Sequence, residues 1–197
     1  RYEEAITAYD QAIRLNPDND SYNDAKGDAL VLLACYEEAI TAYDQAIRLD
    51  PTNAVYYYKK GNALSDLRHH KEAIVAYDQA IHLDPTNAIY YDIKGLALQE
   101  LGLYEGAIAA YEQAIRLELT NANTYIHKGE AFTALNRYEE AIAAYNQAIR
   151  LDPTNAVYYY KKGDALEELE HYEEAIAACD QAIRLDPNNA DYYNKKG

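Results

Sequence analysis

The sequence predicts an all-α protein, an α-solenoid of stacked antiparallel helix pairs. A glycine recurs every 34 residues, at Gly27, Gly61, Gly95, Gly129, Gly163 and Gly197. Prolines recur with the same spacing, at Pro17, Pro51, Pro85, Pro153 and Pro187. Leu119 occupies the one position in this series that lacks a proline. Apolar residues between these positions recur at three- and four-residue steps, as helices require. A period of about 20 to 50 residues is typical of arrays whose units bury their apolar faces against each other.

The first helix of each unit is predicted from a cap and an apolar face, as residues 54–67 illustrate. Asn53 precedes this segment, and asparagine is a preferred N-cap because its side chain accepts hydrogen bonds from free backbone N–H groups. One face of the helix then carries Tyr57, Gly61, Leu64 and Leu67. We expect this helix to end near Leu67.

A short turn and a second helix complete the unit. Arg68, His69 and His70 form the turn, and the second helix is predicted from about Lys71 to Leu83. Its buried positions are Ala73, Ile74, Tyr77, Ala80 and Ile81. Asp84-Pro85 ends it, because proline lacks the N–H that would continue the hydrogen-bond ladder.

The recurring glycine lies inside a helix, where it costs about 1 kcal/mol relative to alanine. Its recurrence therefore predicts a packing role, in which the missing side chain lets the neighbouring helix approach. We expect alanines of the second helix, such as Ala39 and Ala73, to face the glycine, with tyrosines on either side.

These residues resemble the tetratricopeptide repeat, a helix–turn–helix unit of 34 residues. Its signature of aromatic, glycine, alanine and proline positions reads here Tyr57, Gly61, Leu64, Ala73, Tyr77, Ala80 and Pro85. The resemblance covers essentially the whole chain and implies a single array over residues 1–197. Its full repeats are 20–53, 54–87, 88–121, 122–155 and 156–189; partial repeats at 1–19 and 190–197 supply a second and a first helix only. The resemblance also implies a right-handed superhelix whose first helices line a concave groove.

Two departures from the repeat pattern carry expectations of their own. Asn23 stands where the other repeats have a tyrosine, which predicts looser packing of that repeat. Glu118-Leu119 replaces Asp-Pro, and Gly106 interrupts the next helix start. The repeat at 88–121 is therefore expected to be looser, or its second helix longer.

Composition excludes several classes of function. The chain has 33 acidic and 18 basic residues, for a formal net charge of -15. Nucleic acid is a poor partner for such a surface, because Lys and Arg supply most of that affinity. No apolar run approaches the roughly 18 residues of a membrane span, and no signal-peptide pattern is visible. A cytoplasmic location is the default, because Cys35 and Cys179 are too distant to pair and no export signal is visible. Cys179 stands where other repeats have a tyrosine, and we expect it to be a small buried side chain.

The resemblance also indicates which side chains face the groove. The candidate peptide-binding residues are Tyr58, Asn62, Asp92, Leu96, Ile126, Glu130, Tyr160, Asp164 and Glu168. Unlike the core positions, these change from repeat to repeat, as a specialised surface or neutral drift would make them. Some family members hold a C-terminal carboxylate with a clamp of lysines, an arginine and asparagines. Of the corresponding positions only Asn62 matches, so a carboxylate clamp is not expected.

No catalytic, cofactor-binding or metal-binding residues are predicted, and the chain is not expected to be an enzyme. His69-His70 is the only histidine cluster, and a metal site needs three or four convergent ligands. No phosphate-binding loop, nucleophile elbow or zinc-protease spacing is present.

The residue before each repeat glycine is lysine, at Lys26, Lys60, Lys94, Lys128, Lys162 and Lys196. One interpretation lays each lysine stem along apolar neighbours with its ammonium group in solvent. The sharper hypothesis is a ladder of ion pairs to an acidic row on the preceding second helices, at Asp10, Asp44, Asp78, Glu112 and Asp180. Asn146 interrupts this row, so Lys162 should lack a carboxylate.

Two functions follow from this pattern. The first is a protein–protein interaction scaffold that binds a peptide or partner helix of basic character in an acidic concave groove. The alternative is a structural segment that self-associates head to tail through uncapped half-repeats. A regulatory arm attached to an enzyme elsewhere is a third reading of the same residues.

Overall fold

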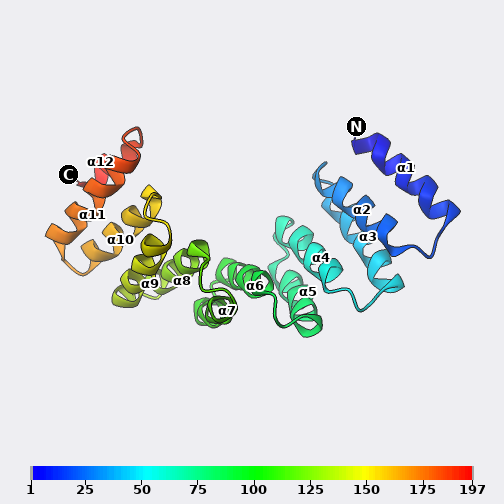
Figure 1. Cartoon of the computed structure of the whole chain (residues 1–197), viewed down its shortest axis with the longest axis horizontal. Helices are drawn as coiled ribbons and strands as arrows, with labels where there is room; N and C mark the ends of the chain where they lie inside the picture. The colour runs from blue at the N-terminus through cyan, green and yellow to red at the C-terminus, as the bar shows by residue number, and fades with distance from the viewer. Residues whose placement is uncertain (1, 197) are drawn as a thin grey trace. The chain divides into compact units, whose positions relative to one another are not determined.

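A computed structural model describes the backbone of residues 2–196 and the side chains as far as Asn194; Gly197 and the side chain of Lys196 lie outside this range. The described residues form twelve α-helices and no strand (Figure 1). The helices are α1 (Tyr2–Leu15), α2 (Asp20–Val31), α3 (Tyr36–Leu49), α4 (Ala54–Asp66), α5 (His70–Leu83), α6 (Ala88–Glu100), α7 (Tyr104–Leu117), α8 (Ala122–Ala134), α9 (Tyr138–Leu151), α10 (Ala156–Glu168), α11 (Tyr172–Leu185) and α12 (Ala190–Lys196). The predicted all-α class is confirmed.

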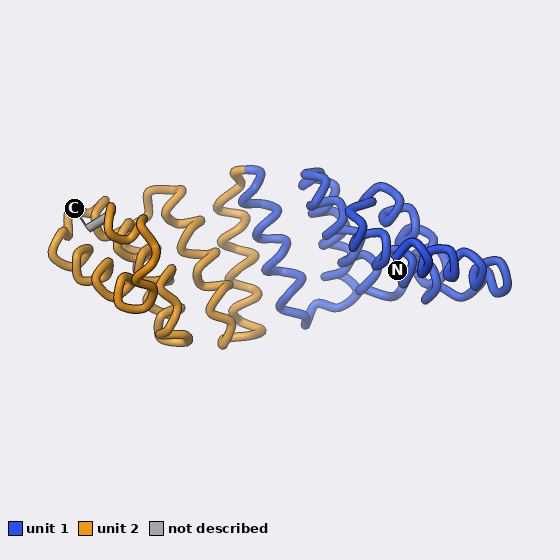
Figure 2. The backbone as a smooth tube through the Cα atoms, turned by 90° about the horizontal axis from the view of Figure 1, so that it is seen from above, with its two compact units in different colours: residues 1–101 blue, residues 102–197 orange. Residues whose placement is uncertain are grey.

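The helices fall into two compact units, Arg1–Leu101 with α1 to α6 and Gly102–Gly197 with α7 to α12 (Figure 2). Within each unit every helix packs against the next one in the chain. Each unit is therefore a stack of helix pairs, as a helical-repeat solenoid requires.

Asparagine caps start the first helices of the pairs, as the sequence predicts. The Asn53 side chain accepts a hydrogen bond from the Val55 N–H at 3.1 Å, and Asn19, Asn87, Asn121 and Asn155 make the equivalent bond. Each cap satisfies a backbone donor that has no partner inside its helix.

The first helices end in the predicted short turn, but the sequence did not reveal its hydrogen-bond pattern. After α4 the His69 N–H donates to the Leu64 carbonyl at 2.9 Å and the Arg68 N–H to the Ser65 carbonyl at 2.8 Å. These two hydrogen bonds together form the Schellman motif. The motif requires one residue with a left-handed backbone conformation. That residue is Arg68 here, and Ala34, Gly102, Asn136 and Glu170 in the other repeats. Because the motif ends at His69, α5 begins at His70, one residue before the predicted start.

The expectation of a longer second helix after Gly106 is wrong. Helix α7 ends at Leu117 and has 14 residues, like α3 and α5. The Glu118 N–H donates to the Ala114 carbonyl at 2.8 Å, as Asp84 donates to Ala80 in the proline-containing repeat. The last turn therefore closes in the same way without the proline.

The repeat glycines face tyrosine rings. A Cβ atom added to Gly27, Gly61 or Gly129 would overlap the ring of Tyr43, Tyr77 or Tyr145, respectively. In these repeats the atoms nearest to the glycine belong to the tyrosine ring and not to the expected alanines; Ala39, Ala73 and Ala141 are fully buried. At Gly163 the facing residue is Cys179, which is 2 % exposed and fills the tyrosine slot as expected.

Candidate functional site

The candidate groove residues divide between the two units. Tyr58, Asn62, Asp92 and Leu96 lie on α4 and α6 of the first unit. Ile126, Glu130, Tyr160, Asp164 and Glu168 lie on α8 and α10 of the second. All nine come from first helices of the pairs.

In the first unit the candidate residue Tyr58 belongs to an aromatic pair. The rings of Tyr58 and Tyr90 lie 5.3 Å apart between centroids and are tilted by 35°. Tyr90 is buried, and this burial is the main reason that its pKa is raised. Tyr58 is half-buried, so it offers part of its ring to a ligand.

Asn62 is committed to an internal contact. Its side-chain oxygen accepts a hydrogen bond from the Tyr77 hydroxyl at 3.0 Å. Asp92 and Leu96 are half-buried on α6. All four first-unit candidates are half-buried.

An ion-pair cluster lies beside this aromatic pair, and the sequence did not indicate it. The Lys59 ammonium group contacts Asp24 at 2.7 Å and Asp28 at 2.7 Å, bridging α4 and α2. Burial lowers the pKa of Lys59, but the hydrogen bonds to the two carboxylates outweigh it and raise that pKa. Burial, with Asp28 and Asp20 nearby, raises the pKa of Asp24 despite Lys59. One cation thus serves several carboxylates, and the negative charge is in excess.

In the second unit the same elements recur at the equivalent positions. Tyr160 and Tyr192 lie 5.2 Å apart with a tilt of 39°. Lys161 contacts Glu130 at 2.9 Å, bridging α10 and α8. Glu168 accepts a hydrogen bond from the Tyr138 hydroxyl at 3.2 Å and is exposed, whereas Asp164 is half-buried.

Ile126 differs from the other candidates because it is buried, with 7 % of its surface exposed. Its side chain packs inside the second unit. Lys59 and Lys161 adjoin the candidates Tyr58 and Tyr160 in the sequence but were not among the candidates. The only signal for them is the Lys-Lys pair before the glycine, whose first lysine points toward the preceding first helix and whose second does not.

The lysines directly before the repeat glycines form the predicted ladder. Lys26 contacts Asp10 at 2.7 Å, and the same pair joins Lys60 to Asp44 at 2.6 Å, Lys94 to Asp78 at 2.5 Å and Lys128 to Glu112 at 2.8 Å. Lys162, opposite Asn146, has no ion pair with any described residue. The Lys196 side chain lies outside the described residues.

Within the described part of the chain, no three His, Cys, Asp or Glu side chains gather as they would around a metal ion. Cys35 and Cys179 are free thiols. Among residues 2–196, none of the helices combines the length and apolar character that crossing a membrane requires.

Two family models match the sequence. One described as TPR repeat matches residues 1–33, 27–67, 95–133 and 129–170. One described as tetratricopeptide repeat matches residues 54–87 and 156–189. No curated protein matches.

Several solved structures share the fold. YrrB, described as a TPR protein with an unusual peptide-binding site, is 23% identical with a TM-score of 0.80, over 96% of this chain and 97% of YrrB. A MamA structure is 28% identical with a TM-score of 0.79, over 84% of this chain and 97% of its own. The C-terminal part of a TPR repeat-containing protein from Cytophaga hutchinsonii is 19% identical with a TM-score of 0.86, over 98% of this chain and 78% of its own.

The helix pairs, the glycine–tyrosine packing and the matches along most of the sequence lead to one assignment. The chain belongs to the tetratricopeptide-repeat family, whose all-α helical-repeat solenoids are scaffolds for protein–protein interactions.

Proposed function

We propose that this chain, as one tetratricopeptide array of residues 1–197, binds a basic peptide or partner helix on the acidic faces of its first helices, without a carboxylate clamp. The observation that carries the proposal is repeated in each unit. In each unit a half-buried tyrosine, Tyr58 or Tyr160, is paired with a buried one and adjoins a lysine that contacts carboxylates of the preceding first helix, two for Lys59 and one for Lys161.

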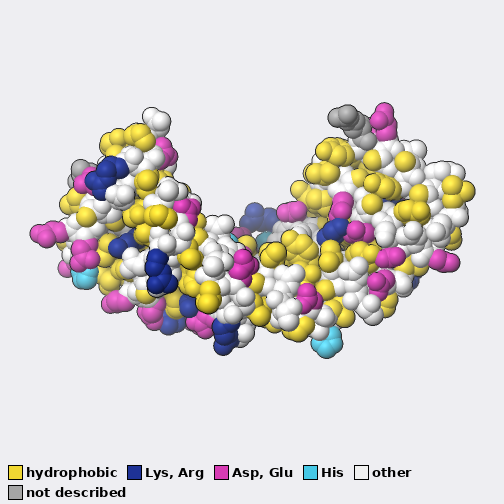
Figure 3. All heavy atoms as spheres, in the orientation of Figure 1, with side chains coloured by type: hydrophobic (Ala, Val, Ile, Leu, Met, Phe, Trp, Pro, Cys, Tyr) yellow, Lys and Arg dark blue, Asp and Glu magenta, His cyan; other side chains and the backbone are white. Residues whose placement is uncertain are grey.

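The second unit offers the more open version of this surface. Tyr160, Asp164 and Glu168 follow each other at four-residue steps, so they share one face of α10. Lys161 pairs with Glu130 on α8, and Asp164 and Glu168 add two further carboxylates to the same face of α10. Acidic side chains also lie among hydrophobic ones over both units in the face drawn in Figure 3.

A basic ligand uses both parts of this surface. Its apolar atoms lie on the Tyr160 ring, while its Lys or Arg side chains meet Asp164 and Glu168. A cation above a tyrosine face adds about 0.5–1 kcal/mol at exposed sites. The peptide-binding site described for YrrB, a protein of the same fold, supports a peptide ligand. The free thiols of Cys35 and Cys179 support a cytoplasmic setting.

The test compares peptide arrays of basic, neutral and acidic sequences, followed by fluorescence anisotropy on the peptides that bind. In the variant Asp164→Lys/Glu168→Lys, affinity for basic peptides is expected to fall by at least about tenfold, since each lost charged contact is worth about 1.4 kcal/mol or more. The matched control, Glu105→Lys/Glu139→Lys, makes the same charge change on exposed first-turn residues of second helices.

Equal affinity of the two variants for basic peptides contradicts the proposal. Self-association head to tail, the alternative function, predicts concentration-dependent growth in sedimentation that survives the charge reversal of Asp164 and Glu168.

A further inference from the structure

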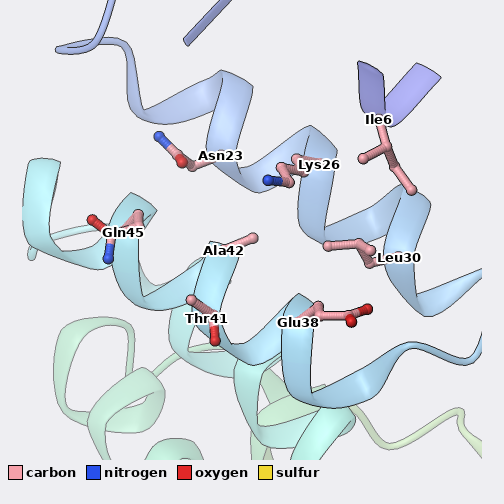
Figure 4. A pocket seen from close by; sticks show the side chains of 8 residues that line it. All are labelled: Ile6, Asn23, Lys26, Leu30, Glu38, Thr41, Ala42 and Gln45. Carbon is pink, nitrogen blue, oxygen red and sulfur yellow. The ribbon is translucent and has the colours of Figure 1, made fainter. Parts of the chain in front are cut away.

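A second set of hollows recurs away from the tyrosine pairs. Pocket A lies between α1, α2 and α3, has a volume of about 400 Å³, and is lined by Lys26, Leu30, Glu38 and Ala42, among others (Figure 4). Pocket B lies 34 residues further along the chain, between α3, α4 and α5, with a volume of about 410 Å³. Its equivalent residues are Lys60, Leu64, Glu72 and Ala76. Pocket C in the second unit is smaller, about 270 Å³, with Lys128, Phe132, Glu140 and Ala144.

These pockets do not belong to the groove face. Successive residues of an α-helix are rotated by about 100°. On α4, the pocket residues Tyr57, Lys60 and Leu64 therefore lie on a different side from Tyr58 and Asn62. A ligand of pocket B would leave the tyrosine pair uncovered.

Pocket B carries excess negative charge over an apolar floor. Its cation, Lys60, is held by Asp44 at 2.6 Å. Glu72, on α5, also lines the pocket and has no ion-pair partner among the described residues. Counting Asp44, which holds Lys60 but does not line the pocket, one lysine stands against two carboxylates, a net charge of −1. The buried Leu64 and Ala76 form the apolar floor, and the exposed Val75 lies beside them. Pocket A has the same count with Lys26, Asp10 and Glu38.

Pocket C shows how the chain itself fills this kind of surface. Arg137 donates to Glu140 at 2.6 Å and 2.9 Å, and its guanidinium carbon lies 4.6 Å from the centre of the Phe132 ring. Arg137 thereby brings the net charge of pocket C to zero, with Lys128 and Arg137 against Glu112 and Glu140. The hydrogen bond from Arg137 lowers the pKa of Glu140.

The residues at the position of Arg137 in the other two repeats are Cys35 and His69. Neither supplies a permanent positive charge, so pockets A and B keep a glutamate and an apolar floor without the arginine that covers them in pocket C. We propose that pockets A and B bind arginine side chains presented by a partner protein, in the arrangement that Arg137 adopts beside Glu140 and Phe132.

Arginine fits this arrangement better than lysine. Its planar guanidinium group presents several N–H donors to one carboxylate, and Arg137 donates from Nε and Nη2 to the same oxygen, Oε1 of Glu140. Its stem covers apolar surface while the charged end stays at the rim, where Glu72 lies.

Pocket B has a selective reporter, because the chain contains only four valines, Val31, Val55, Val75 and Val157, and Val75 lines this pocket. The experiment records valine methyl resonances by NMR while Nα-acetyl-arginine methylamide is added to the full chain. The expected result is a saturable shift of Val75 with little change at Val55 and Val157. The citrulline analogue, which has the same shape without the charge, should leave Val75 unmoved. The lysine analogue should bind several-fold more weakly.

Two variants test the assignment of the residues. Glu72→Gln should weaken the arginine probe at Val75 by at least about tenfold, since it removes a charged hydrogen bond. His69→Arg copies the Arg137 arrangement into pocket B, so Val75 should shift without any probe and should no longer respond to it. Conversely, Arg137→His should give Phe132, the only phenylalanine of the chain, a new response to the arginine probe.

A non-saturating response, an equal response to citrulline or lysine, or an unchanged response in Glu72→Gln overturns the proposal. So does a folded His69→Arg variant that responds to the probe like the original chain. If a variant does not fold by circular dichroism, the comparison of the three probes on the unchanged chain still decides.

Discussion

The ring of Tyr77 lies directly against the backbone of Gly61, in the space that any other side chain at position 61 would need. This contact joins α4 to α5, and it recurs between Gly27 and Tyr43 and between Gly129 and Tyr145. At Gly163 the facing atom is the smaller Cys179 Sγ, 3.1 Å from an added Cβ. The chain therefore contains its own control for the role of the repeat glycine.

Gly61→Ala is expected to destabilise the protein, whereas Gly163→Ala is not. Overpacking a core costs about 1–3 kcal/mol, which exceeds the gain of about 1 kcal/mol from replacing glycine inside a helix. At position 163 the Cys179 side chain moves by a few tenths of an ångström, and the helix gain remains. Thermal unfolding followed by circular dichroism should show a lower midpoint for Gly61→Ala only. Equal losses in both variants would show that the tyrosine ring is not the cause.

A second prediction concerns the turns after the first helices. Ala34 has φ 57°, in the left-handed region that costs a non-glycine residue roughly 1 kcal/mol, whereas Gly102 fills the equivalent turn with φ 73°. Ala34→Gly should therefore increase the free energy of unfolding by about 0.5–1 kcal/mol and raise the unfolding midpoint. Gly102→Ala, where nothing lies within 4 Å of an added Cβ, should lower it through backbone strain alone. A midpoint for Ala34→Gly at or below that of the original chain would contradict this account.

The repetition made most of the fold predictable. Each repeat carries the asparagine cap, the apolar helix face and the signal that ends the second helix, so an element that is ambiguous in one repeat is defined by the others. The Schellman turns were not predictable, because in four repeats the residue with the left-handed backbone is not the usual glycine but Ala34, Arg68, Asn136 or Glu170. The small size of both residues predicts alanine opposite the repeat glycine, but the atoms nearest to Gly27, Gly61 and Gly129 belong to a tyrosine ring.

The candidate site was less predictable, because it depends on contacts between repeats. The spacing of Lys60 and Asp44 is fixed by the 34-residue period, and the ion pair followed from it. Lys59 adjoins Lys60 in the sequence, yet it contacts Asp24 and Asp28 on α2, whereas Lys60 contacts Asp44 on α3. Which of two adjacent lysines faces the groove depends on how the helix is rotated in the stack, and composition does not reveal that rotation.

The ladder supplies a third prediction. Lys162 faces Asn146 where the other repeats have a carboxylate, so Asn146→Asp should add the missing ion pair. The existing pairs are partly exposed, and such pairs contribute typically below about 1 kcal/mol. The gain in unfolding midpoint should therefore be small at low salt and should vanish at about 1 M salt, where the Debye length is about 3 Å. Lys162→Met combined with Asn146→Asp is the control, because the new carboxylate then has no partner and the gain should be absent.

The last prediction is a loss of stability at alkaline pH that depends on the buried tyrosines. Burial raises the pKa of Tyr145 to about 12, and Glu130 and Asp164 act in the same direction, while the hydrogen bond with Thr133 acts against them. An unfolded tyrosine has a pKa of about 10. Because the folded pKa is the higher one, the contribution of Tyr145 is complete below about pH 10 and is lost as the pH rises through about 12.

Tyr145→Phe should therefore lower stability at neutral pH, because the contact with Thr133 is lost, yet should make the decline between pH 10 and 12 shallower. Tyr172→Phe, at a side chain that is 58 % exposed, is the control and should leave the slope unchanged. Urea unfolding at several pH values gives the slopes, and absorbance at 295 nm reports tyrosine ionisation in the same samples. Parallel slopes for Tyr145→Phe and the original chain would mean that ionisation of Tyr145 does not drive alkaline unfolding. Tyr56, whose pKa burial and Asp20 also raise to about 12, would then be the next residue to replace.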